Sequence, residues 1–335
     1  MNNRGMPAEP LTVVEICAGA GGQSVGLEQA GFRHILAVEI DADAAATLRA
    51  NRPDWHVMTS DVRQVRGFDV PRTDLLAGGV PCPPFSIAGK QLGADDERDL
   101  FPEALRLVDE IKPRAVMLEN VRGLASARFD TYRQSILNRL DQLGYESQWR
   151  LVHASDFGVP QLRPRFILVA LRRDIAPYFK WPEPQGAAPS VGVILGELMA
   201  ANGWKGARAW ATRANGIAPT VVGGSKKHGG PDLGPTRARA KWLELGVDGR
   251  GVVDEAPDAQ MPDDHIPRLT NKMVARVQGF PPEWTFVGRK TAVYRQIGNA
   301  FPPPVAAAIG RAIAAAMRAA ATANVVATED VDEAI

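Results

Sequence analysis

The sequence predicts an α/β fold with a mostly parallel sheet, joined to a smaller irregular domain. Short apolar runs alternate with helix-like stretches over the first 170 residues, as in proteins built from strand–helix–strand units. From Pro177 to residue 267 the chain is rich in Pro, Gly and Trp and has no long periodic runs. A third region begins near Arg268 and ends in an Ala-rich helix.

The expected strands are short apolar runs, which cover residues 11–16, 35–39, 74–77, 115–118 and 166–171. The expected helices between them cover residues 22–30, 41–51, 100–111 and 132–143. Three prolines at 302–304 suit the start of a C-terminal helix over 305–323. The acidic last dozen residues are expected to fray. Segment 177–267 is expected to hold short strands and loops.

Charge is unevenly distributed, although the formal net charge of the 335 residues is only +1. Segment 205–250 holds nine Lys or Arg against three acids, and segment 251–264 holds five acids and no Lys or Arg. The basic segment is suited to contact with phosphates. A solvated loop is about as good an explanation for any single residue in it.

Composition excludes several classes of protein. With 45% hydrophobic and 23% charged residues, the chain is typical of soluble globular proteins. Arg311 and Arg318 interrupt the longest apolar stretch, so no membrane span is expected. Residues 1–10 lack the apolar core of a secretory signal, which makes the reducing cytoplasm the expected location. Two cysteines cannot form a disulfide framework or a four-thiolate metal site, so no metal is expected.

The first expected strand runs into a glycine-rich turn that could accept a ligand. Cys17-Ala18-Gly19-Ala20-Gly21-Gly22 does not fit the dinucleotide fingerprint, because Ser24 stands where the third glycine belongs. An ordinary strand-to-helix turn is the alternative. Glu39 ends the next strand, where an acid can accept two ribose hydroxyls. Asp61-Val62 follows a third apolar stretch. Three such features at successive strand ends indicate a nucleoside-like cofactor.

Cys82 lies in a proline-stiffened loop after another strand, where it should open into the same cleft. A buried structural cysteine is the alternative. A zinc-deaminase motif is excluded because Phe85 stands where its second cysteine belongs. A nucleophile is the better interpretation, since a thiolate attacks electrophilic carbon well.

Two further motifs carry charge toward this cleft. Glu119-Asn120-Val121 ends the next strand. Arg163 and Arg165 alternate in an extended segment, which would place both guanidinium groups on one side. Two fixed cations at a cleft suggest recognition of a carbonyl oxygen or a phosphate. Solvated strand ends are the alternative for both motifs.

Taken in order, these motifs resemble the DNA (cytosine-5)-methyltransferase family. The matching segments are Ala18-Gly19-Ala20-Gly21-Gly22, Glu39, Pro81-Cys82, Glu119-Asn120-Val121, Gln161-x-Arg163-x-Arg165, Arg268-Leu269-Thr270, Gln278-Gly279-Phe280-Pro281 and Tyr294-Arg295-Gln296-Ile297-Gly298-Asn299-Ala300. The chain departs from the family twice. Cys17 replaces the usual Phe before Ala-Gly, which removes an aromatic contact with adenine, and Pro83 replaces a frequent Gln after the catalytic cysteine.

The resemblance implies a Rossmann-like S-adenosylmethionine-dependent methyltransferase that modifies C5 of cytosine. Cys82 would attack C6 of a base flipped out of the duplex. Glu119 would hydrogen-bond N3 and the exocyclic amine, Arg165 would hold O2, and Arg163 would support the site or a phosphate. The implied cofactor-binding residues are Cys17, Ala18, Gly19, Gly21, Gly22, Glu39, Ile40, Asp61, Val62, Pro81 and Asn299.

The same resemblance implies two domains and a DNA partner. Residues 1–175, completed by 290–335, would form the catalytic domain, and 176–289 the target-recognition domain with a variable core at about 176–267. Double-stranded DNA is the expected substrate of a monomer without an obligatory protein partner, in a restriction-modification system or as a stand-alone enzyme. The expected DNA contacts are Ser86, Lys226, Lys227, His228, Arg237 and Arg239, of which the last five fall in Gly- and Pro-rich loops.

Two alternatives remain at this point. A tRNA cytosine-5 methyltransferase shares this architecture, but the basic insert favours DNA because sequence readout needs such a module. A non-catalytic relative that binds DNA or senses cofactor is the second, and the presence of Cys82, Glu119 and Arg165 argues against it.

Overall fold

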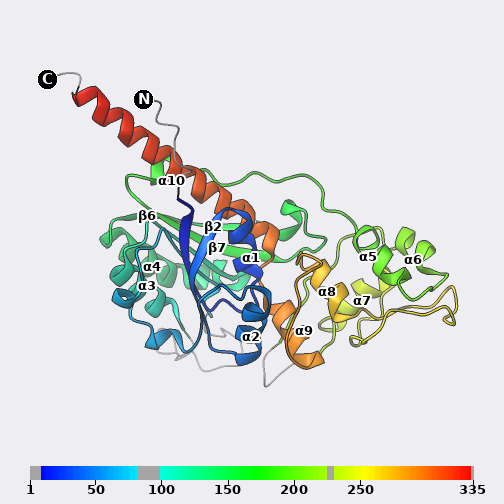
Figure 1. Ribbon diagram of the computed structural model, residues 1–335. Helices are drawn as coiled ribbons and strands as arrows, with labels where there is room; N and C mark the ends of the chain where they lie inside the picture. The colour runs from blue at the N-terminus through cyan, green and yellow to red at the C-terminus, as the bar shows by residue number, and fades with distance from the viewer. Residues whose placement is uncertain (1–8, 82–98, 225–229, 333–335) are drawn as a thin grey trace, which may run out of the picture.

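Residues 9–81, 99–224 and 230–332 are described by a computed structural model, in which one sheet forms the centre of the larger part of the molecule (Figure 1). Its seven strands are β1 (Leu11–Ile16), β2 (Phe32–Glu39), β3 (Val57–Thr59), β4 (Leu75–Gly78), β5 (Ala115–Val121), β6 (Tyr145–His153) and β7 (Pro164–Arg172). They are ordered β3-β2-β1-β4-β5-β7-β6, and β7 alone runs in the direction opposite to the other six strands. The mostly parallel sheet predicted from the sequence is confirmed.

Helices cover both faces of the sheet, which explains why its central strands are continuous apolar runs. The flanking helices are α1 (Gly22–Gln29), α2 (Ala42–Asn51), α3 (Phe101–Ile111), α4 (Asp130–Gln142) and α10 (Pro303–Asp332). Alternate residues of β1 enter different cores, as the two-residue period of a strand requires. Val13 packs with α1 and α10, and Val14 packs with α3 and α4.

Three elements of this part differ from the sequence-based expectation. The expected strand ranges include neither β3, a three-residue strand foreseen only as an apolar stretch before Asp61, nor β6, an edge strand whose residues are mostly half-buried or exposed. Neither strand shows the continuous apolar run that marks a fully buried strand. Helix α10 is assigned from Pro303 to Asp332, so it extends beyond residue 323, where the sequence analysis ended it.

The second part of the molecule contains short helices joined by loops, whereas the sequence analysis expected short strands and loops. It contains α5 (Val191–Ala200), α6 (Ala207–Arg213), α7 (Thr236–Glu244), α8 (Asn271–Val277) and α9 (Lys290–Asn299). Within the described residues of 177–267 there is no strand, only isolated bridges such as Val253 with Thr270. These helices are seven to ten residues long, too short to show an amphipathic period between prolines and glycines.

Three buried tryptophans hold the helical part together. Trp204, Trp210 and Trp242 share one apolar cluster with residues of α5, α8 and α9. The cluster also includes Leu48 of α2, so the helical part packs directly against the sheet-containing part. By length and composition, the stretch 290–323 would also suit a membrane crossing, but 61% of its most apolar window is buried inside the protein. Burial of that kind is typical of a core helix.

Candidate functional site

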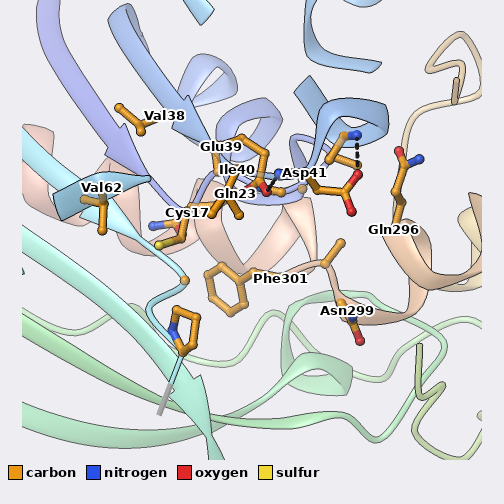
Figure 2. A pocket seen from close by; sticks show the side chains of 18 of the residues that line it. Cys17, Gln23, Val38, Glu39, Ile40, Asp41, Val62, Gln296, Asn299 and Phe301 are labelled. Carbon is orange, nitrogen blue, oxygen red and sulfur yellow. Dashed lines mark hydrogen bonds between the residues drawn. The ribbon is translucent and has the colours of Figure 1, made fainter. Parts of the chain in front are cut away.

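A cavity of about 490 Å³ lies at the carboxyl edge of the parallel strands (Figure 2). Its walls come from the ends of β1, β2, β4 and β5, the segment after β3, and the connector between α9 and α10. The strand order reverses between β1 and β4, and open α/β sheets bind ligands at such a reversal. The volume falls within the range of small-molecule sites.

The glycine-rich turn after β1 is held in a left-handed backbone. Cys17, Gly19 and Gly21 have φ angles of 51°, 56° and 92°. A Cβ on Gly22 would overlap the carbonyl oxygen of Phe301, so this turn and the α9–α10 connector touch only because residue 22 is glycine. Cys17, Gly19 and Gly22 line the cavity, as does Ala18.

Gly21 is the one expected cofactor-binding residue that does not line the cavity. A Cβ at Gly21 would overlap the ring of Trp284, whose Nε1 donates to the Ala20 carbonyl at 3.1 Å. Gly21 is therefore required for packing of the turn against Trp284. The sequence could not separate this role from ligand contact, because both need a glycine.

Glu39 fastens the turn to the end of β2. Its Oε2 accepts the Gly19 N–H at 2.7 Å and its Oε1 accepts the Asp41 N–H at 2.7 Å. Burial raises the pKa of Glu39, and these two N–H donors oppose that shift. Each carboxylate oxygen can accept a further hydrogen bond, so the same side chain can face a hydroxyl in the cavity.

Asp61 and Val62 line the cavity where the chain leaves β3. Asp61 caps a short 3₁₀ turn by accepting the Arg63 N–H at 2.9 Å, and it pairs with the Arg63 guanidinium at 2.9 Å. Ile40 also lines the cavity and is 68% exposed, an unusual exposure for a large apolar side chain. These positions match the sequence-based expectation.

Glu119 and Arg165 form a buried ion pair at the cavity wall. Glu119 Oε1 lies 2.6 Å from Arg165 Nε, and the side chains are 12% and 11% exposed. Burial lowers the pKa of Arg165, and the Glu119 carboxylate opposes this. Asn120 donates to the Val80 carbonyl at 2.9 Å, which ties the end of β5 to the segment that follows β4. Glu119 lines the cavity, whereas Arg165 reaches it through Glu119.

Arg163 does not point into the cavity, which corrects the expectation that both arginines face one cleft. It is 1% exposed and donates to the carbonyls of Val221, Gly298 and Ala300 at 2.7–2.8 Å. Arg163 precedes β7, so strand alternation does not govern it. Carbonyls at the end of a helix lack intrahelical partners, and the end of α9 supplies two of the three here. Arg163 is a positioning residue that fixes the connector beside the cavity.

The end of α9 and the connector to α10 contribute a wall of the cavity that the sequence predicted only at Asn299. Asn299 was expected and lines the cavity, with its Nδ2 donating to the Gly224 carbonyl at 3.1 Å.

The lining residues of the whole cavity that are absent from the expected cofactor and catalytic sets are Ala20, Gln23, Val38, Asp41, Ala44, Ser60, Arg63, Gly79, Leu100, Arg295, Gln296, Ala300 and Phe301. Several of these residues belong to, or directly follow, motifs that the sequence analysis recognised. That position in the sequence was the signal by which they could have been predicted.

Five expected site residues lie outside the described residues: Cys82, Ser86, Lys226, Lys227 and His228. Pro81, which directly precedes Cys82, lines the cavity, as does Gly79. Gly79 and Pro81, which precede the expected nucleophile in the sequence, therefore line the same cavity as Glu119.

Arg237 and Arg239 lie on helix α7, which corrects their expected placement in loops. Arg237 is exposed, whereas Arg239 is half-buried beside Gly249 and donates to the Thr236 hydroxyl at 3.3 Å. Neither lines the cavity. The Gly-Pro sequence before them signals a turn, but here it directly precedes a helix.

A family model and two similar protein sequences indicate the same family for this chain. The sequence model of the C-5 cytosine-specific DNA methylase family matches residues 11–315. The type II methyltransferase M.NaeI of Lentzea aerocolonigenes is 64% identical over 316 residues, covering 92% of this chain and 76% of the relative. M.NgoMIV of Neisseria gonorrhoeae is 52% identical over 312 residues, covering 92% and 98%.

Solved structures share the fold. A variant of Spodoptera frugiperda DNMT2 superposes with a TM-score of 0.64 at 17% identity, covering 90% of this chain and 99% of that one. The Entamoeba histolytica methyltransferase EhMeth gives 0.64 at 17% identity, covering 91% and 98%. At such identities the likeness concerns the fold alone.

Proposed function

Because this chain belongs to the C-5 cytosine-specific DNA methylase family, we propose that it methylates C5 of a cytosine within a specific double-stranded DNA sequence, using S-adenosylmethionine. The observation that carries the proposal is the buried Glu119–Arg165 ion pair, in which Glu119 lines the same glycine-lined cavity as Pro81. A cofactor cavity and a base-recognition pair thus share one wall. The high identity to type II methyltransferases supports a role in restriction-modification.

The cavity fits the proposed cofactor in size and chemistry. Glu39 offers carboxylate oxygens for ribose hydroxyls, and Asp61 and Ile40 offer an acceptor and an apolar surface for an adenine. Gln23 is 3% exposed, lines the cavity, and has no partner among the described residues for either atom of its amide. A buried amide without a partner is costly, so Gln23 suits a polar ligand. When bound, the cofactor supplies the electrophilic methyl group that C5 accepts.

Glu119 and Arg165 act on the base. Glu119, held by Arg165, would hydrogen-bond N3 and the exocyclic amine of the flipped cytosine and so stabilise charge that develops on the ring. The remaining N–H donors of Arg165 would face O2. Low exposure of both side chains strengthens these interactions, because water competes with them less.

Cys82 would supply the nucleophile. Its thiolate forms a bond to C6, and the ring electrons displaced by this bond make C5 nucleophilic. After C5 has been methylated, loss of its proton restores the double bond and expels the thiolate. The base must leave the duplex to reach these groups.

Residues 176–289 are proposed as the target-recognition domain, and 1–175 with 290–335 as the catalytic domain. The basic segment 205–250 and the exposed Arg237 support contact with duplex phosphates. We further propose a cytoplasmic monomer.

Bisulfite sequencing of DNA from cells expressing the protein tests the proposal. One short sequence should carry methylated cytosine at a fixed position, and cells expressing Cys82→Ala should not carry it. Unmodified DNA throughout, with folded protein present, would contradict the proposed activity. Methylated tRNA with unmodified DNA would assign the RNA alternative.

A further inference from the structure

Helices α2 and α9 both contribute to the wall of the cavity. Asp41, the N-cap of α2, and Ala44 in its first turn line the cavity, as do Arg295 and Gln296 of α9. Figure 2 shows the Gln296 side chain extending from α9. The two helices come from opposite ends of the sequence, so their spacing depends on contacts between side chains and backbone.

One buried hydroxyl joins these helices. Thr47 lies three residues after Ala44 on the same face of α2, is 0% exposed, and does not line the cavity. Its Oγ1 donates to Gln296 Oε1 at 2.7 Å and accepts the Val287 N–H at 2.9 Å. Gln296 Nε2 donates in turn to the Val287 carbonyl at 2.8 Å. The hydroxyl, the amide and the backbone groups of Val287 therefore form a closed hydrogen-bonded set.

Segment 284–287, which leads from α8 to α9, is docked at two further points. Trp284 Nε1 donates to the Ala20 carbonyl of the glycine turn at 3.1 Å. Asn51 of α2 donates to the Thr285 carbonyl at 2.7 Å and accepts the Thr285 N–H at 2.9 Å. The segment thus holds the glycine turn and α2 in register with the start of α9.

We propose that Thr47 is a positioning residue for the cofactor: its hydroxyl sets the spacing of α2 and α9, and with it the wall that Ala44 and Gln296 present to S-adenosylmethionine. The inference rests on the proposed function, since it takes S-adenosylmethionine as the ligand. A wall that is already ordered before the ligand arrives costs less free energy to order on binding, which raises affinity. Thr47 acts through Gln296, because it does not itself line the cavity.

General stabilisation of the fold is the competing explanation, since the loss of any buried hydrogen bond lowers stability. Thr73 is a matched control. It is 3% exposed, and its Oγ1 donates to the Pro71 carbonyl at 2.8 Å. It precedes β4, at the opposite end of that strand from Gly79 in the cavity wall. Thr47→Val and Thr73→Val each remove one buried hydroxyl and keep the shape of the side chain.

The experiment is calorimetric titration of the full chain with S-adenosylmethionine and, separately, S-adenosylhomocysteine, with thermal unfolding of each variant. Thr47→Val should raise Kd about two- to tenfold, the net effect of one hydrogen bond, because the ligand must then supply the order that the hydroxyl provided. Thr73→Val should lower Tm and leave Kd unchanged. Thr47→Ser keeps the hydroxyl and should bind as the wild type does.

A double-mutant cycle tests the route through Gln296. Gln296→Met removes the amide, so adding Thr47→Val to it should raise Kd by less than Thr47→Val does alone. Additive effects would overturn this route. If Thr47→Val does not fold, Asn51→Leu replaces it, because it frees Thr285 from α2 at a half-buried position and should raise Kd in the same direction.

The outcomes separate this inference from the proposed function. A wild-type chain that binds either compound, with an unchanged Kd in the folded Thr47 variant or its replacement, would overturn the positioning role and leave the proposed function standing. Equal changes of Kd in Thr47→Val and Thr73→Val would also overturn it, since stability alone would then explain both. A wild-type chain that binds neither compound would overturn the proposed function and this inference together.

Discussion

Replacing Glu39 by Gln tests whether one carboxylate holds the cofactor turn in place. Both oxygens of Glu39 accept backbone N–H groups at 2.7 Å, one from Gly19 and one from Asp41. The amide of Gln keeps one acceptor oxygen and turns an NH₂ donor toward the other N–H. One of these two hydrogen bonds must therefore be lost.

The expected loss of unfolding free energy in Glu39→Gln follows from the burial of the Glu39 carboxylate. Glu39 is 8% exposed, and a hydrogen bond to a charged group contributes about 1.5–3 kcal/mol to stability. Burial already raises the pKa of Glu39, so removing its charge recovers part of that cost and places the loss near the lower end. Cofactor affinity should fall as well, by about tenfold for each 1.4 kcal/mol of binding free energy lost.

Urea unfolding and calorimetric titration measure the two effects. Glu28→Gln is the matched control, because Glu28 pairs with Arg52 while both side chains are about one-third exposed. Such pairs contribute about 0.2–1 kcal/mol. Equal unfolding free energies for Glu39→Gln and Glu28→Gln would refute the role of Glu39 in holding the turn.

Three other predictions concern residues around the cavity and the helical part. Arg163→Lys should lower the unfolding free energy by about 1–3 kcal/mol for each buried carbonyl left without a donor. A loss below about 1 kcal/mol in urea unfolding would show that the three carbonyls are satisfied without it. In a Cys82→Ala variant, Cys17 should resist thiol reagents at pH 8 until the chain unfolds, because burial and nearby Glu39 raise its pKa to about 12; rapid labelling of the folded protein would contradict this. Arg237→Ala should weaken duplex binding and, if Arg237 contacts a phosphate, reduce the slope of log Kd against log salt by about one. Unchanged affinity, site preference and slope would place α7 away from the DNA.

The strand ends were the most predictable part of this molecule. β1 begins and ends where the apolar run 11–16 does, and Glu39 and Asp61 lie at the cavity as expected. A parallel sheet buried on both faces requires long apolar runs, and its carboxyl edge collects the polar residues that follow them. The local sequence therefore indicates both the strand and the polar cavity residues that follow it.

Contacts between distant segments could not be predicted in this way. Arg163 was expected at the cleft, but its partners are backbone carbonyls 58–137 residues away, which no side-chain pattern marks. Phe301 was missed at the cavity because it lies there only where the connector meets the glycine turn at Gly22. The short helices of the second part were missed because their packing on buried tryptophans leaves no period in the sequence.

Covalent trapping tests the proposed chemistry most directly. A duplex in which the target cytosine is replaced by 5-fluorocytosine, incubated with the protein and S-adenosylmethionine, should give a complex that survives denaturing electrophoresis, because fluorine cannot leave C5 as the proton does. Peptide mapping should place the bond on Cys82, and Cys82→Ala should bind the cofactor normally and form no complex. A stable adduct mapped to another residue, or none from a wild-type protein that methylates the unmodified duplex, would contradict attack by Cys82 on C6.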